Sequence, residues 1–514
     1  MASPPGTGVR MRRAAHAVAG IPALLILLTG SRALAQAAPP APHEDVAFDF
    51  MNVLAQHGLH DLEDEWWNAY GQTTYISTWK SPFTAPYTNF NGSTNSLLPS
   101  RERAFTWSAT LYIGAKLWSG GEAYFSPEII AERPLSSLHG LGGAIQIFEL
   151  QKGGSETPQI YKARLYLRQT FGLGGEPQKK ESNPLQLGAT VDSRRIVLTA
   201  GNFSLLDVMD KNGVAGDAHQ TFFNMAFMTH ASWDFVADAR GYSYGAALEF
   251  YWDDWAVRFA HMAPPQNPNQ LPVDFRLWQY FGDQLEIEHD HVLFGQPGAV
   301  RLLGYRNRVF TGSFDDAVSV FQADPSKNAA ACAGFNYGSQ NATAPDLCWV
   351  RKDNVKVGIG IDLEQFVSKD IGVFLRAMYS DGQSEVDAFN AADRSMSFGM
   401  VARGALWGRP FDVTGLGVGL SWISSSHARY LALGGIDGFI GDGPCPALVT
   451  GTEDLAACAG RRQTTEGVFE AFYSFNLLKA IWLAGDFQLI WNPAYNSDRP
   501  GPVVILGAKV HAEF

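Results

Sequence analysis

Long apolar runs are nearly absent from this 514-residue chain. The one such run, residues 14–28, is shorter than the roughly 20 residues that a membrane-spanning helix needs. It follows three arginines between positions 10 and 13 and precedes an Ala-Leu-Ala cleavage site at 33–35, which is the order of a secretory signal. We therefore expect residues 1–35 to be a signal peptide, with a membrane anchor as the weaker alternative. A membrane protein made by this chain has to cross the bilayer as strands.

Basic residues are the minority among the charged ones. The chain has 39 Lys and Arg against 51 Asp and Glu. The expected signal peptide contains four arginines and no acidic residue, which leaves 35 basic and 51 acidic residues and a net charge of −16. This excess argues against nucleic acid as a partner and favours neutral or cationic partners. We expect no cofactor.

Cysteine is also scarce, and the four cysteines form two local pairs. An even number in an exported chain predicts two disulfides, Cys332–Cys348 and Cys445–Cys458. Both pairs lie in segments rich in Gly, Ala, Asp and Pro, so we expect them to close long loops. Neither pair has the close Cys-x-x-Cys spacing of a zinc site, and we expect no metal centre.

The last residues of the chain have the alternation of a half-wetted strand. Every second side chain from 504 to 512 is apolar, and Lys509, His511 and Glu513 lie between them. A strand of this kind that ends on Phe514 is the usual close of a bacterial outer-membrane β-barrel. We therefore expect the outer-membrane barrel assembly machinery to recognise Phe514.

The segment 353–377 repeats this alternation in a hairpin with a short turn at 368–370. Aliphatic residues occupy one face, while Lys356, Asp362, Glu364 and Arg376 lie on the other. Four such charges cannot share a dry core without large desolvation costs, so they need water on their side. A barrel with charge inward and aliphatic residues outward is a transmembrane barrel.

Short turns alternate with long connections along the chain, notably 204–240, 309–352 and 425–463. This is the pattern of periplasmic turns and extracellular loops, and tryptophans near the strand ends fit interfacial girdles. Seventeen segments resemble strands, but the phase of the turns requires an even number, so one N-terminal segment is over-counted. We predict an all-β fold, a transmembrane antiparallel β-barrel of 16 strands over residues 66–514, with 18 strands as the alternative. The connections 131–159 and 204–240 are long enough to fold into the pore.

Residues 43–65 have a different pattern from the rest. Their apolar residues recur at roughly helical spacing with acidic residues between them. We predict a short periplasmic helix within an N-terminal segment at 36–65, and a disordered leader is the alternative.

Several motifs recur in order along the chain and resemble those of one family. They include Trp-Asn-Ala-Tyr-Gly-Gln at 67–72, Leu-Trp-Ser-Gly-Gly-Glu at 117–122, Tyr-Phe-Ser-Pro-Glu at 124–128, and the segments 163–176, 194–207, 222–224, 238–243 and 298–308. Together with Asn-Pro at 492–493 and the terminal Phe514, they resemble the OprB-type carbohydrate-selective porins. The resemblance extends from about residue 66 to 514.

This resemblance implies a sixteen-stranded sugar channel in the outer membrane of a Gram-negative bacterium, with a constriction lined by arginine and glutamate. Some relatives in the family serve manganese uptake, so the resemblance leaves the solute open. One departure from the family pattern concerns Asp207 and Asp210, which are separated by Val-Met where aspartate–phenylalanine–aspartate is commoner. Whether this loop makes the family's contacts is therefore open.

Two predicted neighbouring strands carry the strongest candidates for pore-lining residues. Lys162, Arg164, Tyr166 and Arg168 alternate with leucines at strict period two, which predicts one lumenal face. On the preceding strand the candidates are Glu122, Tyr124 and Glu128. Arginine and carboxylate groups replace water on sugar hydroxyls, and opposed rows of charge produce a field across a pore. The equal alternative is that these residues are wall ion pairs that hold the barrel in shape.

The connection 207–240 supplies candidates for a loop constriction. They are Asp207, Asp210, Asn224, Asp234, Asp238 and Arg240. Carboxylates in this segment, with His219 and His230, are groups that attract a divalent cation. A polar loop folded by Asx turns is the favoured alternative.

The pattern as a whole predicts a passive diffusion channel for mono- and disaccharides, with no energy coupling. Its expected partners are small neutral sugars, outer-membrane lipid and lipopolysaccharide, and further copies of the chain in a homotrimer. A cation-selective porin that passes a divalent metal such as manganese is the first alternative. A structural, adhesive or hydrolytic barrel is the second, and no serine or cysteine stands out as a partner of the histidine–aspartate pairs. We expect no enzymatic activity.

Overall fold

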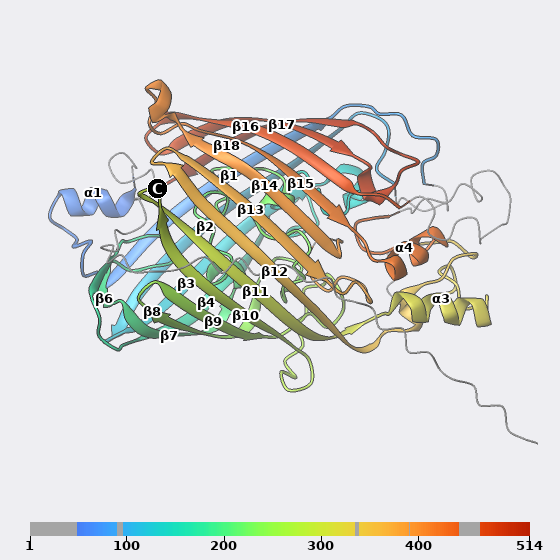
Figure 1. Ribbon diagram of the computed structural model, residues 1–514, viewed down its shortest axis with the longest axis horizontal. Helices are drawn as coiled ribbons and strands as arrows, with labels where there is room; N and C mark the ends of the chain where they lie inside the picture. Colours follow the sequence, from blue (N-terminus) through green and yellow to red (C-terminus); the bar gives the residue numbers. More distant parts are fainter. Residues whose placement is uncertain (1–48, 90–95, 335–338, 390, 442–462) are drawn as a thin grey trace, which may run out of the picture. The chain divides into compact units, whose positions relative to one another are not determined.

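The computed structural model describes residues 49–89, 96–334, 339–389, 391–441 and 463–514 (Figure 1). The expected signal peptide at 1–35 and the expected disulfide Cys445–Cys458 lie outside the described residues.

Sixteen strands of the described residues form one closed antiparallel barrel, in which β1 pairs with β18 (Figure 1). The barrel strands are β1 (Trp67–Lys80), β2 (Glu102–Trp118), β3 (Gly121–Arg133), β4 (Gln159–Gly172), β7 (Arg194–Phe203), β8 (Ser243–Trp252), β9 (Trp255–Met262), β10 (Phe281–Leu293), β11 (Gln296–Thr311), β12 (Lys352–Ser368), β13 (Ile371–Ser380), β14 (Arg394–Arg403), β15 (Val413–Trp422), β16 (Glu466–Leu478), β17 (Ile481–Trp491) and β18 (Val503–Glu513). The predicted fold class and strand number are confirmed.

The over-counted strand is the segment 183–192. Its last residues form β6 (Ala189–Asp192), which pairs with β5 (Pro177–Lys180) in a separate two-stranded sheet. The barrel continues directly from β4 to β7, where Gly172 lies opposite Arg195. Both ends of the connection 173–193 therefore lie at the end of the barrel that also holds the short turns, and this resolves the conflict of phase.

Alternation along the strands separates an apolar outer wall from a charged inner wall. On β12, Val355, Val357 and Ile359 point outward and are exposed, whereas Lys356 and Asp362 point inward and are buried. This is the orientation predicted from the sequence. The inward charges are nevertheless covered, because two connections of the chain fold into the lumen.

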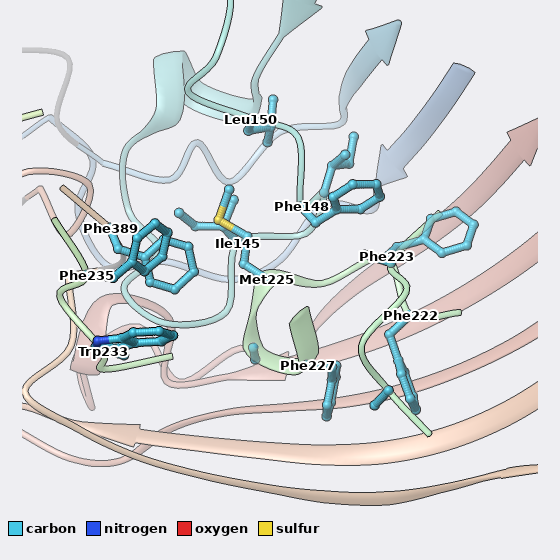
Figure 2. Packing of buried hydrophobic residues seen from close by; sticks show 14 of the residues in the cluster. Ile145, Phe148, Leu150, Phe222, Phe223, Met225, Phe227, Trp233, Phe235 and Phe389 are labelled. Atoms are coloured by element: carbon cyan, nitrogen blue, oxygen red, sulfur yellow. The ribbon is translucent and has the colours of Figure 1, made fainter. Parts of the chain in front are cut away.

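These two connections are residues 134–158, which contain η1 (Leu135–Leu138), and residues 204–242, which contain η2 (Leu205–Asp207) and α2 (Met225–Met228). They are joined by backbone hydrogen bonds from Met225 N to Ile145 O at 2.9 Å and from Phe148 N to Phe223 O at 2.8 Å. Figure 2 shows their apolar side chains gathered in one cluster. We call this cluster the loop core.

The loop core also packs against the barrel wall. The ring of Phe222 lies 4.6 Å from that of Phe227, 5.7 Å from Phe374 on β13 and 5.0 Å from Phe472 on β16, measured between centroids. Gly417 on β15 faces the ring of Phe227, where a side chain would collide with it. The hydrophobic effect therefore holds the internal segments against this part of the wall.

The remaining helices lie at the two ends of the barrel. They are α1 (Phe50–Gln56), α3 (Phe314–Ala323), α4 (Ser425–Ala432), η3 (Leu347–Trp349), η4 (Gly404–Trp407) and η5 (Pro493–Tyr495). Figure 1 shows α1, β6 and the C-terminus at one end, and α3 and α4 at the other. The short helix expected near the N-terminus is α1, which is capped by the Asp49 carboxylate. Among the described residues, no helix has the length and apolarity to cross a membrane.

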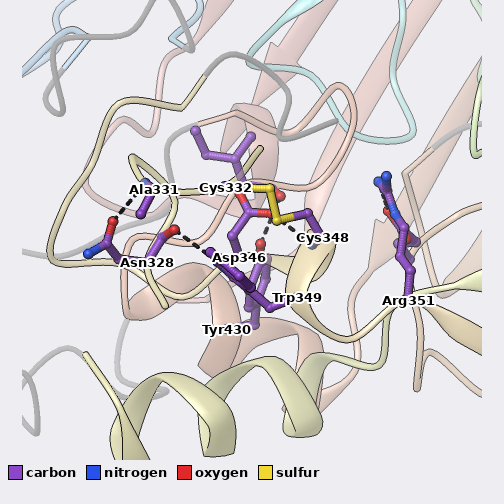
Figure 3. Close-up of a disulfide and its surroundings, with 10 residues drawn as sticks. Asn328, Ala331, Cys332, Asp346, Cys348, Trp349, Arg351 and Tyr430 are labelled. Atoms are coloured by element: carbon purple, nitrogen blue, oxygen red, sulfur yellow. Dashed lines mark hydrogen bonds and ion pairs between the residues drawn. A yellow bond between two sulfur atoms is a disulfide. The ribbon is translucent and has the colours of Figure 1, made fainter. Parts of the chain in front are cut away.

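The disulfide Cys332–Cys348 is present in the long connection between β11 and β12, as predicted (Figure 3). The neighbouring Asp346 carboxylate accepts the backbone N–H of Cys348 at 2.8 Å. Burial raises the pKa of Asp346 to about 7. The pairing of both sulfurs with each other leaves them unavailable as metal ligands.

Candidate pore lining

The predicted residues of β3 and β4 meet on the inner wall. Tyr124 lies opposite Tyr166, and Glu122 opposite Arg168. The two tyrosine rings stack with centroids 5.0 Å apart, and the Arg168 guanidinium lies 5.0 Å and 5.5 Å from their centres. The Tyr124 hydroxyl donates to Glu122 at 2.8 Å, while Arg168 Nη1 is 3.8 Å from the same carboxylate. The side chains of Arg168 and Glu122 keep 15% and 18% of their surface exposed, so these two groups are accessible from the lumen, whereas the rings of Tyr124 and Tyr166 are buried.

Arg164 has a different environment from Arg168 although both lie on β4. Its guanidinium donates twice to the Asp207 carboxylate, from Nε at 2.8 Å and from Nη2 at 2.7 Å. Asp207 also accepts the backbone N–H of Ser204, which completes the cap of η2. Burial alone would raise the pKa of Asp207, but the Arg164 guanidinium outweighs it and holds that pKa below its usual value. Arg164 therefore anchors the internal segment.

Lys162 does not lie on the lumenal face that strict alternation predicts, so this part of the prediction is wrong. The pairing of β3 with β4 shifts between Ser126 and Pro127, so that Pro127 lies opposite Lys162. Ala163 is the extra residue of this bulge, and it is fixed by Asn202, whose side-chain amide donates to the Ala163 carbonyl at 2.7 Å. Lys162 consequently faces outward and contacts the ring of Tyr244, 4.6 Å from its centre.

Tyr161 takes the inward position beside Glu128. Its hydroxyl donates to the Glu128 carboxylate, which also accepts from Thr110 at 2.8 Å and lies 3.5 Å from Lys152 Nζ. Glu128 is thus buried and saturated, in contrast to Glu122.

A row of ion pairs, which we call the arginine ladder, crosses the inner wall from β9 to β12. Arg258 donates to Glu286 and Glu288 on β10, each at 2.7 Å. Arg301 on β11 donates to Glu288 as well, to Asp362 at 3.0 Å and to Glu364 at 3.3 Å. Each arginine shares its guanidinium between at least two carboxylates, so both cations of the ladder are fully engaged.

Arg376, Asp210 and Lys356 fix the internal segment 204–242 to the wall. Arg376 Nε donates to Asp210 at 3.2 Å, and its Nη1 donates to the carbonyl of Phe227 at 2.9 Å. Burial would raise the pKa of Asp210, but the Arg376 charge outweighs it and lowers that pKa. Lys356 Nζ donates to the buried Asp234 carboxylate at 3.0 Å. Asp362 and Glu364 accept from the same segment, through the side chain of Asn212 at 2.7 Å and the backbone N–H of Gly213.

The remaining candidates for the loop constriction act within the loops. Asn224 is fully buried, caps α2 and donates to Ala144 O at 3.1 Å. Asp238 accepts the backbone N–H groups of Arg240 and Tyr242 in an Asx turn, and Arg240 lies over the ring of Tyr161 at 4.1 Å. Four of the six candidates, Asp207, Asp210, Asn224 and Asp234, are buried.

The exposed side chains of the segment 204–242 are those of Lys211 and Asp217, and His219 is half-buried. Lys211 is exposed, and the side chains of Asp217 and His219 are 56% and 27% exposed. Lys211 is missing from the sequence-based candidates, as are Arg195, Arg258 and Arg301. The alternation along β9 and β11 could have identified Arg258 and Arg301 as lumenal. Exposed apolar residues, for example, flank Arg258 on both sides.

Residues 241–245 have the Gly-x-Ser-x-Gly spacing of a hydrolase nucleophile elbow. Ser243, however, is the first residue of β8 and is buried, and its hydroxyl donates to the carbonyl of Ala263. An elbow requires a strand-to-helix turn with an exposed hydroxyl, so this serine is not placed as a nucleophile.

A closed barrel with an apolar exterior, a charged inner wall and internal loops has the architecture of a porin. Residues 94–514 match the family model described as carbohydrate-selective porin, OprB family, and the chain belongs to this family. The fold is similar to the high-pH structure of Pseudomonas putida OprB, with a TM-score of 0.62 and 13% identity over 90% of this chain and 97% of that one. The low-pH structure of the same protein gives a TM-score of 0.46 at 10% identity, over 90% and 98% of the two chains. The channel DcaP of Acinetobacter baumannii gives 0.45 at 9% identity, over 87% and 97%. No curated protein sequence matches the chain.

Proposed function

We propose that this protein is a passive diffusion channel for mono- and disaccharides in the outer membrane of a Gram-negative bacterium. The observation that carries the proposal is the accessible pair of Glu122 and Arg168, which lies beside the buried rings of Tyr124 and Tyr166. A guanidinium beside a carboxylate exchanges hydrogen bonds with the hydroxyls of a sugar. Membership of a carbohydrate-selective porin family supports the same solute class.

The contacts that Arg168 makes leave it free to bind a solute weakly, which favours passage of the solute over tight binding. A channel has to bind its solute weakly enough to release it. Arg168 lies 3.8 Å from Glu122 and donates to the carbonyl of Leu185 at 2.8 Å, so it retains donors for a passing hydroxyl. The guanidiniums of the arginine ladder are already shared between carboxylates. We therefore assign solute selectivity to Arg168 and a structural role to Arg164.

The cation-selective alternative has one supporting feature, the exposed pair Asp217 and His219 beside Glu149, whose carboxylate is 3.7 Å from His219 Nε2. The other acidic candidates of this segment are engaged, since Asp207, Asp210 and Asp234 bind Arg164, Arg376 and Lys356. We therefore keep divalent metal as the alternative solute.

The proposal extends to the surroundings of the barrel. Lipid and lipopolysaccharide would contact the apolar outer wall. Phe514 is 48% exposed and joined to Gly71 by two backbone hydrogen bonds, which leaves its ring available to the barrel assembly machinery. A homotrimer is the oligomeric form that we propose, and native electrophoresis of the detergent-extracted protein tests it.

The decisive experiment is swelling of liposomes that contain the purified protein, in isosmotic glucose or maltose. We expect swelling in both sugars, and an altered ratio of the two rates in Arg168→Ala because the donor beside the tyrosine pair is lost. Arg194→Ala is the matched control, because Arg194 pairs with Asp253 at the short-turn end, away from the tyrosines, at 2.8 Å. Swelling in neither sugar, together with manganese conduction, would replace the sugar channel by the cation channel. Equal swelling rates in wild type and Arg168→Ala would show that Arg168 has only a structural role in the barrel wall.

A further inference from the structure

Three basic residues of the lumen lack a carboxylate partner, in contrast to the saturated arginine ladder. They are Lys180 on β5, Arg195 on β7 and Lys211 in the internal segment 204–242. Among the described residues, no carboxylate oxygen lies within ion-pair distance of any of the three, although 51 acidic residues outnumber 39 basic ones in the chain. Charges left unpaired in such an acidic protein need a physical explanation.

The fold brings these residues together from three separate parts of the chain. Arg195 Nη1 donates to the side chain of Gln178 at 3.0 Å, which holds β5 against the start of β7. Lys180 follows two residues after Gln178 on the same strand, so both side chains lie on one face of β5. The Arg195 guanidinium lies 4.0 Å from the centre of the Tyr251 ring, and Arg195 is largely buried.

Lys211 is presented to this group by its two neighbours in the chain. The backbone N–H of Asp210 donates to Glu286 at 2.7 Å, and the side chain of Asn212 donates to Asp362 at 2.7 Å. Both acceptors belong to the arginine ladder. Lys211 is therefore held at the ladder with its own side chain exposed to the lumen.

The charges of Arg195 and Lys211 also act on Lys180. Burial, and then the charges of Arg195 and Lys211, lower the pKa of Lys180 to about 8, against smaller opposing effects of Glu249 and Asp290. The surrounding barrel also partly desolvates the Lys211 ammonium group and lowers its pKa, with Glu249 and Asp207 opposing and Arg168 and Arg258 assisting. Two cations and two carboxylates therefore act on each lysine.

Two of these carboxylates, Glu249 and Asp207, are bound by other cations. Glu249 accepts from the Tyr251 hydroxyl at 2.6 Å and lies 3.4 Å from Arg258 Nε. Asp207 is bound twice by Arg164. Asp290 is the remaining carboxylate facing Lys180, a single negative charge against three positive ones.

We propose that Lys180, Arg195 and Lys211 form a site in the pore for the carboxylate group of anionic sugars of the aldonic acid class. The inference rests on the proposed sugar channel and adds a charged class of solute to it. Glu122 and Arg168 would contact the polyhydroxyl chain, and the three cations would hold the carboxylate. A carboxylate relieves the repulsion between the cations, which is why an anion is favoured here over a neutral sugar.

The experiment compares ion selectivity and sugar passage in the same reconstituted protein. Reversal potentials in gradients of potassium chloride and potassium gluconate give the anion-to-cation permeability ratio. We expect wild type to prefer anions and to pass gluconate, and each of Lys180→Gln and Lys211→Gln to lower the ratio by about threefold, since one charge is removed from a water-filled pore. Lys211→Arg should retain the ratio. Lys179→Gln is the matched control, because Lys179 lies on the opposite face of β5 and binds Glu63 at 2.8 Å.

The ratio should also fall as the pH rises from 7 to 9, because the pKa of Lys180 is about 8, and this fall should disappear in Lys180→Gln. An unchanged ratio in both glutamine variants, with normal barrel mobility on electrophoresis and normal glucose swelling, would overturn the anion site and leave the sugar channel intact. Anion preference that depends on the lysines, with no swelling in any neutral sugar, would retain the site and overturn the sugar channel.

Discussion

The loop core and the arginine ladder hold the same internal segments in place by different forces. In the loop core, rings such as Phe222 and Phe227 pack at centroid distances of 4.6 Å with no directional bond. In the ladder, Arg301 aims its donors at carboxylates on two neighbouring strands. Apolar packing is graded, because each lost methyl group costs a little. A buried ion pair fails abruptly, because removal of one member leaves the other charged and desolvated.

Arg376→Met should have the largest effect and is the strongest test of this contrast. Methionine keeps much of the volume but leaves Asp210 without its arginine in a site where Arg376 is 1% exposed. We expect the free energy of unfolding to fall by about 3–5 kcal/mol, measured by equilibrium unfolding in guanidinium with refolding into vesicles. Adding Asp210→Asn should recover part of the loss. A fall of less than about 1 kcal/mol, the value of an exposed pair, would remove the distinction between the two regions.

Ile145→Val tests the apolar side of the comparison. Ile145 is buried in the loop core and faces Met225 (Figure 2). The loss of one methylene should lower the free energy of unfolding by about 0.5–1.5 kcal/mol, in the same unfolding experiment. Val355→Ala, on an exposed outward position of β12, is the control for the general effect of trimming an aliphatic side chain. A loss of stability as large as that of Arg376→Met would show that the stability of the loop core does not fall gradually with each lost methyl group.

His219→Asn should have the smallest effect, because water screens a partly exposed pair. Burial lowers the pKa of His219, but the neighbouring carboxylates of Asp217 and Glu149, each 3.7 Å from a ring nitrogen, outweigh it and raise the pKa to about 9. Since this value lies above the ordinary 6.5, the imidazolium stabilises the folded protein fully below pH 6.5, and the contribution is lost as the pH rises through 9. We expect wild type to exceed the variant by less than about 1 kcal/mol at pH 6 and by nothing measurable at pH 10. A difference that persists at pH 10 would contradict the charge-based origin.

The errors of the sequence-based prediction have a common physical origin. The segment 183–192 has strand-like alternation, but its partner is β5 and not a barrel strand. Lys162 has the right parity until Asn202 binds Ala163 and stabilises the bulge. In both cases the local pattern is present, but residues distant in the sequence decide which strand a segment pairs with or which way a side chain points. The site residues Lys180, Arg195 and Lys211 escaped prediction for the same reason, since their proximity depends on three separate elements.

By itself, the sequence determined the barrel, its strand number, the inward direction of Lys356, Asp362, Glu364 and Arg376, and the disulfide Cys332–Cys348. These features depend on the two-residue alternation of a strand and on residues that are close in the chain, and both can be read from a local stretch of sequence. The tertiary structure decided where the internal segments lie, which charges are saturated and which stay exposed. Asp210 and Arg376 are 166 positions apart, and no local pattern records that they meet. The net negative charge of the chain likewise gives no indication of the three unpaired cations in its lumen, because a field in a pore depends on position and not on sum.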